Sequence, residues 1–124
     1  MDTGIKHIEF WVSDLKRSLE FYSQLFPLIG WKQFDDTSFS GGDTKIYFIE
    51  QAVTSNKNVG PRHICFLADS KEVVDSVGEF LKGINTQIIR GPVESSYKNR
   101  SSYTVDFKDP DGYILEVATK SENI

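Results

Sequence analysis

Hydrophobic and polar residues alternate at the start of the chain, which is the pattern of a strand with one face on a core. Residues two apart share a face of a strand. This rule groups Ile8, Phe10 and Val12 on one face, and His7, Glu9 and Trp11 on the other. We therefore expect a strand here whose apolar face packs on a helix.

Apolar residues at spacings of three and four follow, which predicts an amphipathic helix over residues 14–26. Ser13-Asp14 offers an N-cap, and Pro27 and Gly30 close the helix. Short strands are expected at 31–34 and 37–40, and a stronger strand at 45–50. The first half of the chain therefore has the element order βαβββ.

The second half repeats this order after the polar segment 51–60. Gly60-Pro61-Arg62-His63-Ile64 matches Gly4-Ile5-Lys6-His7-Ile8, and Asp69-Ser70 then caps a second amphipathic helix. Strands are expected at 84–90, 103–108 and 113–117, with a polar loop at 91–101 and an Asp-Pro-Asp-Gly turn at 109–112. We predict an α+β fold, with 1–124 as a single domain of two βαβββ modules at about 1–55 and 60–120.

Composition supports a folded protein and excludes several partners. The chain has 124 residues, of which 39% are hydrophobic and 13% aromatic, which argues against overall disorder. Its net charge is −4, so nucleic acid and anionic membranes are not expected partners. The absence of a signal-peptide pattern and of a long apolar run, together with one cysteine, predicts a cytoplasmic protein.

The two histidines of the chain, His7 and His63, occupy matching places in the two modules. A strand histidine is often simply packed or solvated, but two in matching positions would meet across a pseudo-twofold axis. Glu116 is a lone charge in an apolar strand, and Glu50 ends another strand. An isolated buried carboxylate is costly, so each must be solvated, paired or bound to metal. Two imidazoles with one or two carboxylates suit Zn²⁺, Ni²⁺, Fe²⁺, Co²⁺ or Mn²⁺.

Other residues are weaker candidates, and each has an ordinary structural explanation. Asp106 is expected on the face of its strand away from the helix, as a residue that orients a ligand or as a solvated carboxylate. Tyr97 and Arg100 would bind an anionic substrate group or belong to a solvated loop. Trp11 and Phe48 would line a pocket or pack in the core. Cys65 shares a face with His63 and is expected to be a structural thiol.

These residues resemble the vicinal oxygen chelate superfamily, which includes glyoxalase I, fosfomycin and bleomycin resistance proteins and extradiol dioxygenases. The resemblance covers nearly all of residues 4–119. Its most specific parts are His7-Ile8, the helix residues Ser13-Asp14, Ser18, Phe21 and Tyr22, and the segment Phe107 to Val117. It implies curled mixed sheets around a metal-binding cup, with His7, His63 and Glu116 as ligands and Glu50 as a fourth.

The resemblance also implies a homodimer and a small metal-dependent enzyme that chelates neighbouring oxygens of a small-molecule substrate. We expect a lyase or isomerase of the lactoylglutathione-lyase type, with Glu116 as the catalytic base. A three-ligand site with iron would favour oxygen chemistry instead. The alternatives are a thiol-transferase or drug-binding antibiotic-resistance protein of the same fold, or a small dioxygenase. Fold alone does not decide between them.

Overall fold

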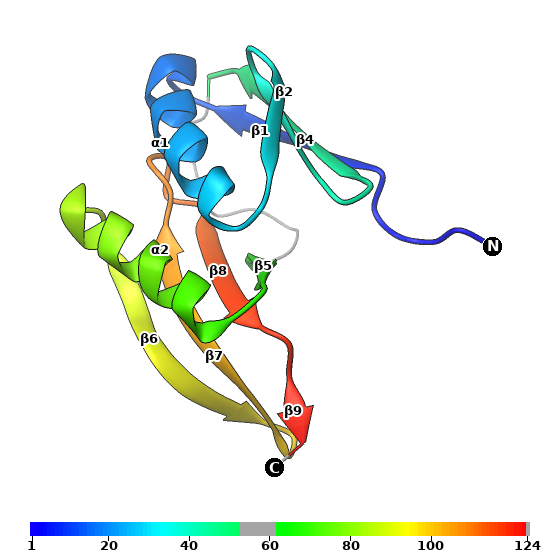
Figure 1. The fold of residues 1–124 in the computed structure, drawn as a ribbon. Coiled ribbons are helices and arrows are strands. Elements are labelled where there is room, and N and C mark those ends of the chain that lie inside the picture. Colours follow the sequence, from blue (N-terminus) through cyan, green and yellow to red (C-terminus); the bar gives the residue numbers. More distant parts are fainter. Residues whose placement is uncertain (53–61, 124) are drawn as a thin grey trace. The chain divides into compact units, whose positions relative to one another are not determined.

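The chain forms two compact units that share one order of elements. The computed structural model describes residues 1–52 and 62–123. The units are Met1–Ser55 and Asn56–Ile124, close to the expected modules. Each contains a strand, a helix and three further strands, and the second unit adds the short strand β9 (Figure 1). The predicted α+β class with two βαβββ repeats is confirmed.

The first unit is a four-stranded sheet with one helix on it. Its elements are β1 (His7–Val12), α1 (Leu15–Leu28), β2 (Lys32–Asp35), β3 (Ser38–Gly41) and β4 (Thr44–Glu50). The strand order is β1-β4-β3-β2, in which β1 and β4 are parallel and the other pairs are antiparallel.

Hydrogen bonds at both ends of helix α1 define where it begins and ends. Asp14 is the N-cap, and its carboxylate accepts a hydrogen bond of 3.1 Å from the backbone N–H of Arg17. The helix runs two residues past the expected end and includes Pro27. Gly30 then takes a φ of 86°, and the N–H of Trp31 donates back to the carbonyl of Phe26 at 3.0 Å.

The core of the first unit is aromatic. Phe48 from β4 is buried and packs on Tyr22 of α1, with ring centroids 4.4 Å apart. Phe10, Phe26 and Phe39 surround this pair. Burying a side chain of this size contributes about 1.5–3 kcal/mol. The alternating residues of β1 thus place their apolar face on α1, as predicted.

The second unit repeats this architecture. Its elements are β5 (Ile64–Ala68), α2 (Lys71–Gly83), β6 (Ile88–Tyr97), β7 (Arg100–Lys108), β8 (Ile114–Thr119) and the short β9 (Glu122–Asn123). The strand order is β5-β8-β7-β6, with β5 parallel to β8 and β9 paired to β7. The core beneath α2 is formed by Val74, Val77, Leu81, Val105, Phe107, Leu115 and Val117.

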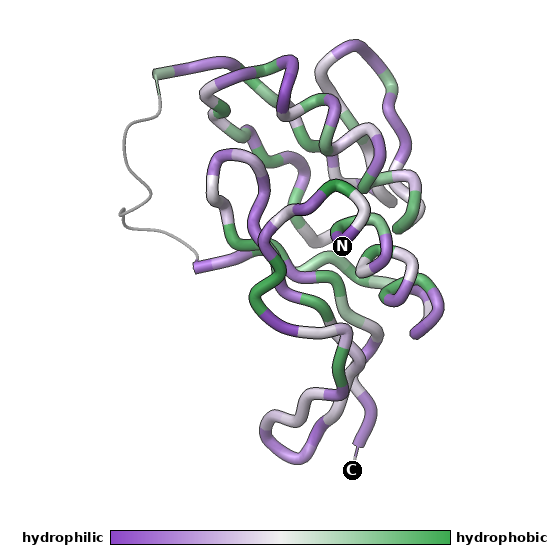
Figure 2. The backbone as a smooth tube through the Cα atoms, turned by 90° about the vertical axis from the view of Figure 1, so that its left-hand side faces the viewer, coloured by the Kyte–Doolittle hydropathy of each residue, from purple (hydrophilic) through white to green (hydrophobic). Residues whose placement is uncertain are grey.

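Strands β6 and β7 form a long hairpin, so the prediction of a loop at 91–101 is wrong. Tyr97 pairs with Arg100 across a turn at Lys98 and Asn99, which have φ angles of 49° and 61°. Two left-handed central residues give the turn that matches the twist of a hairpin. Little apolar colour appears at this end of the hairpin in Figure 2. The outer part of the hairpin, from Glu94 to Ser101, has no buried face and so lacks the alternation that would reveal it.

The turn between β7 and β8 is the one that the Asp-Pro-Asp-Gly sequence predicts. The buried carboxylate of Asp109 accepts hydrogen bonds from the N–H groups of Asp111 at 3.0 Å and Tyr113 at 2.8 Å. Gly112 adopts a φ of 93°, which glycine tolerates. These contacts set the start of β8, and with it the position of Glu116. Neither helix in the described ranges has the length and apolar character to cross a bilayer.

Candidate metal and substrate site

A row of polar side chains crosses the sheet of the second unit on the face away from α2. Strand pairing sets Cys65 opposite Glu116, Glu116 opposite Asp106, and Asp106 opposite Arg90. Their sequence neighbours Phe66, Val105 and Val117 are buried beneath the helix. We call Cys65, Glu116, Asp106 and Arg90 the polar row. The face expected for Asp106 agrees with this pairing.

His63 and Glu116 are in direct contact at one end of the polar row. His63 Nε2 lies 3.1 Å from Glu116 Oε1, and both side chains are partly exposed. The second oxygen of Glu116, Oε2, accepts a hydrogen bond of 2.6 Å from the hydroxyl of Thr104. Arg62 Nη1 lies 3.2 Å from His63 Nδ1. Glu116, the lone charge of its strand, is therefore satisfied on both oxygens.

The second carboxylate of the row has a separate partner. Asp106 Oδ2 lies 3.1 Å from Arg90 Nη2, and Arg90 Nη1 donates to Ser95 Oγ at 3.1 Å. The other oxygen, Asp106 Oδ1, is buried and has no hydrogen-bond partner in the part of the chain that the structure describes. Directly opposed like charges destabilise a sheet. Here each carboxylate turns toward its own donors.

Cys65 is held as a neutral thiol. Burial, and then the negative charge of Glu116, raise the pKa of Cys65 to about 12. A thiol in this state is a poor nucleophile. Cys65 and Glu116 line a cleft of about 400 Å³ that also includes Ser102, Lys120 and Ser121. The cleft gives a small molecule access to the carboxylate.

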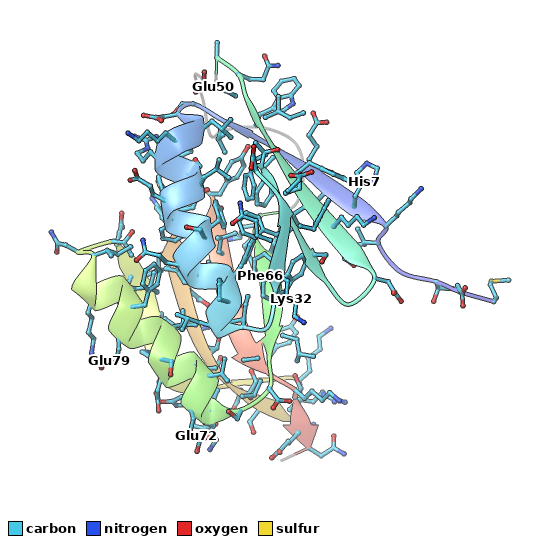
Figure 3. All side chains as sticks on the ribbon, turned by 45° about the horizontal axis from the view of Figure 1, so that its top comes forward. His7, Lys32, Glu50, Phe66, Glu72 and Glu79 are labelled. Atoms are coloured by element: carbon cyan, nitrogen blue, oxygen red, sulfur yellow. The ribbon has the colours of Figure 1, made fainter. Side chains whose placement is uncertain are left out.

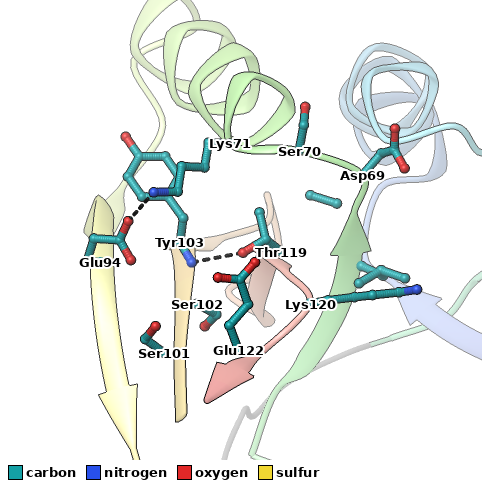
Figure 4. Close-up of a pocket in the computed structure, with 12 residues that line it drawn as sticks. Asp69, Ser70, Lys71, Glu94, Ser101, Ser102, Tyr103, Thr119, Lys120 and Glu122 are labelled. Atoms are coloured by element: carbon teal, nitrogen blue, oxygen red, sulfur yellow. Dashed lines mark hydrogen bonds and ion pairs between the residues drawn. The ribbon is translucent and has the colours of Figure 1, made fainter. Parts of the chain in front are cut away.

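A second cleft of about 520 Å³ adjoins the first at the N-terminal end of α2 (Figure 4). The two share Leu67, Ser102, Thr119 and Lys120. Across the second cleft, Lys71 Nζ lies 2.6 Å from Glu94 Oε1. Its other polar walls are hydroxyl and charged side chains of both signs. Glu116 therefore lines a cleft that adjoins a larger polar cleft within the same unit.

The first unit carries a matching row with different chemistry. Strand pairing sets Glu9 opposite Tyr47, Tyr47 opposite Ser38, and Ser38 opposite Asp35. His7 precedes Glu9 by two residues, as His63 precedes Cys65. The counterpart of Glu116 is therefore Tyr47, whose ring lies edge-on to His7 with centroids 5.4 Å apart. Of these two corresponding positions, only the one in the second unit holds a carboxylate, that of Glu116.

The structure moves Glu50 away from the expected ligand set. Glu50 pairs with Val12 and His7 with Lys45, so they lie on opposite faces and at opposite ends of the β1–β4 pair (Figure 3). Glu50 Oε1 instead accepts a hydrogen bond of 2.9 Å from the N–H of Leu15, the first residue of α1. Glu50 is therefore a helix-capping residue, and its prediction as a ligand beside His7 is wrong.

The two residues expected as pocket walls, Trp11 and Phe48, differ in their exposure. Phe48 is 2% exposed and packs in the aromatic core, which was the alternative expected for it. Trp11 is 52% exposed on the same face as His7, and its Nε1 donates to Glu9 Oε2 at 2.7 Å. Trp11 stays available as a substrate contact.

Tyr97 and Arg100 lie far along the hairpin from the polar row. Arg100 is six residues from Asp106 on β7, which corresponds to about 20 Å of strand. Its Nη2 donates to the carbonyl of Ser121 at 3.2 Å, and Tyr97 is 74% exposed at the hairpin end. The second unit does not bring them to Glu116, so their role in substrate binding stays a prediction.

Sequence reasoning did not identify the bond from Thr104 to Glu116, and it missed Arg90 and Tyr47. Arg90 was hidden because it ends a predicted strand next to a segment taken as a loop. Tyr47 could have been found by aligning the two strand pairs rather than by searching for a second carboxylate. The places of Arg90 and Tyr47 follow from the pairing of neighbouring strands. The alternation of residues within one strand does not reveal that pairing.

The donor atoms of His63 and Glu116 fit a divalent cation. Two neighbouring ligands bound at about 2.1 Å and a right angle are about 3.0 Å apart. The observed 3.1 Å between Nε2 and Oε1 is compatible with that spacing. Within residues 1–52 and 62–123, no three His, Cys, Asp or Glu side chains form a metal-holding group. A set with His7 takes ligands from both units and stays a prediction.

The two βαβββ units and the histidine at the start of each define a class of protein. The family model described as Glyoxalase/Bleomycin resistance protein/Dioxygenase superfamily matches residues 4–117. The chain belongs to this superfamily, as the resemblance implied.

Proteins similar to this chain carry different functional names. The chain is 30% identical over 128 residues to Metallothiol transferase FosB of Staphylococcus epidermidis, covering 94% of this chain and 82% of that protein. It is 27% identical over 121 residues to Virulence protein STM3117 of Salmonella typhimurium, covering 92% and 82%. The crystal structure of the fosfomycin resistance protein FosX from Listeria monocytogenes has a TM-score of 0.73 at 21% identity, covering 97% and 95%. This last likeness shows the fold.

Proposed function

We propose that this protein is an enzyme that binds one divalent cation through His7, His63 and Glu116 and acts on a small oxygen-rich substrate. The observation that carries the proposal is the contact of 3.1 Å between His63 Nε2 and Glu116 Oε1. His7 begins the matching strand of the first unit, in the matching place of its row. Two imidazoles and one carboxylate leave coordination positions for two substrate oxygens.

The reaction that this set favours is addition of a thiol to the substrate. A fourth, carboxylate ligand would favour isomerisation of the lactoylglutathione-lyase type. Glu50 instead caps α1, and Tyr47 occupies the counterpart of Glu116. A single carboxylate is better suited to a transfer in which the substrate's own oxygen takes up the proton. The 30% identity to a metallothiol transferase supports the same choice.

In this transfer a sulfur–carbon bond forms, a carbon–oxygen bond of the substrate breaks, and the thiol proton passes to the released oxygen. A bound cation would supply Lewis acidity to the substrate oxygens. His63 and Glu116 would hold it, and the adjoining clefts would admit the two reactants. In this proposal the attacking sulfur belongs to the second substrate and not to Cys65.

The experiment compares three reactions of one preparation loaded with Zn²⁺, Mn²⁺, Ni²⁺ or Fe²⁺. Fosfomycin with L-cysteine or another low-molecular-weight thiol tests addition, methylglyoxal–thiol adducts test isomerisation, and catechols test oxygen chemistry. We expect thiol addition to require the cation and to be lost in Glu116→Gln, with Glu20→Gln, on the exposed surface of α1, as the matched control. Cation-independent binding of a drug without turnover would instead support a sequestering protein.

The second candidate is the lyase or isomerase, and one feature favours it. Glu116 lines a cleft, where a carboxylate can move a proton between adjacent carbons. Turnover of the methylglyoxal–thiol adduct without turnover of fosfomycin would replace the first candidate by this one.

A further inference from the structure

Thr104 is a buried hydroxyl placed against the candidate ligand. It lies on β7, on the face of the polar row, and its side chain has no exposed surface. Its Oγ1 donates to Glu116 Oε2 at 2.6 Å. Threonine has a branched, stiff side chain, so a buried position fixes its hydroxyl well.

The hydroxyl proton has one preferred destination. Thr104 Oγ1 also lies 3.3 Å from the carbonyl oxygen of Val117. A hydroxyl has one proton to donate. The carboxylate is closer and charged, so it takes the stronger bond. The contact with Glu116 is therefore the one that the folded chain maintains.

Strand pairing explains why Glu116 turns toward Thr104. Glu116 is directly opposite Asp106, whereas Thr104 is opposite Ala118 and thus diagonal to Glu116. Long side chains reach diagonal partners in a sheet. The small side chain of Ala118 leaves room for this. Asp106 turns instead toward Arg90 on the other side, and the two carboxylates are held apart.

We propose that Thr104 is a positioning residue for metal binding: it holds Oε2 of Glu116 so that Oε1 alone faces the cation beside His63 Nε2. This inference rests on the proposed function. Glu116 would then be a one-oxygen ligand in a fixed orientation. Removing a group that orients a metal ligand weakens metal affinity by roughly 10–100-fold in other proteins.

The test compares Thr104→Val, which removes the hydroxyl and keeps the branched shape, with Thr104→Ser, which keeps the hydroxyl. Thr86→Val is the matched control, because Thr86 is half-buried in the same unit and donates to the carbonyl of Lys108, outside the site. Zn²⁺ affinity of the full chain is measured by competition with a chromophoric chelator. Thermal unfolding of each metal-free variant is recorded alongside.

We expect Thr104→Val to lose roughly 10–100-fold in Zn²⁺ affinity, whereas Thr104→Ser and Thr86→Val stay within a few-fold of the wild type. Equal affinity of Thr104→Val and wild type, with affinity lost in Glu116→Gln, would overturn this inference alone. Losses in Thr104→Ser and Thr86→Val as large as the loss in Thr104→Val would also overturn it. No Zn²⁺ binding by the wild type would overturn the proposed function, and this inference with it.

Discussion

Replacing Glu50 by alanine separates two roles for this carboxylate, a metal ligand or a cap of α1. The structure assigns it to the cap, because Oε1 accepts a hydrogen bond of 2.9 Å from the N–H of Leu15. That N–H is one of the donors that a helix leaves unpaired at its start. Asp14 satisfies another, the N–H of Arg17.

The expected loss of stability in Glu50→Ala is modest. A hydrogen bond to a charged group contributes about 1.5–3 kcal/mol, and an exposed charge at a helix end adds about 0.3–1 kcal/mol. Glu50 is exposed, so water replaces much of this contact when it is lost. We expect the free energy of unfolding to fall by about 1 kcal/mol, as for other caps. For a chain of this size, Tm falls by about 4 °C.

Urea unfolding followed by circular dichroism measures this change, and a chelator competition measures Zn²⁺ affinity in the same variant. Glu20→Ala, on the exposed surface of α1, is the matched control and should leave both quantities nearly unchanged. The reasoning is refuted if Glu50→Ala keeps full stability but loses tenfold or more in Zn²⁺ affinity. That pattern would restore Glu50 to the ligand set.

Three further predictions concern the core residue Phe48, the thiol of Cys65 and the buried carboxylate of Asp109. Phe48→Ala should lower the free energy of unfolding by about 3–5 kcal/mol in urea titration, because Phe48 is a core residue; a loss below 1 kcal/mol would contradict that placement. Metal-free native protein should be alkylated at Cys65 on the order of 10³ times more slowly at pH 8 than the urea-unfolded chain, since a pKa of about 12 leaves little thiolate; equal rates would contradict it. Asp109→Ala should cost about 1–3 kcal/mol in thermal unfolding, because two N–H donors lose their acceptor; an unchanged Tm would show that the turn does not need it.

The sequence predicts the elements whose faces differ in polarity. In β1 the apolar residues Phe10 and Val12 alternate with His7 and Trp11, and the structure buries the first pair and leaves Trp11 exposed. The turn from Asp109 to Gly112 was also predictable from the sequence, because few sequences favour its backbone geometry. The β6–β7 hairpin was missed because its outer part, from Glu94 to Ser101, has no buried face to impose alternation.

The candidate site was only partly predictable for a related reason. Glu116 was found because a charge in an apolar strand needs a partner, but its partner Thr104 is set by the pairing of β7 with β8. Glu50 shares a face with Ile46 and Phe48, and both of those residues are buried. That pattern indicated the helix side of the sheet. Only the position of the N-terminus of α1 shows what the carboxylate does there.

The most direct test of the metal site uses the fact that the chain has only two histidines. Their imidazole ¹⁵N signals are followed by NMR as Zn²⁺ is added to the metal-free protein. If one cation binds both rings, the signals of His7 and His63 shift together and stop changing at about one equivalent of Zn²⁺. A shift of the His63 signals alone, or no shift of either ring, would contradict a site shared by the two units.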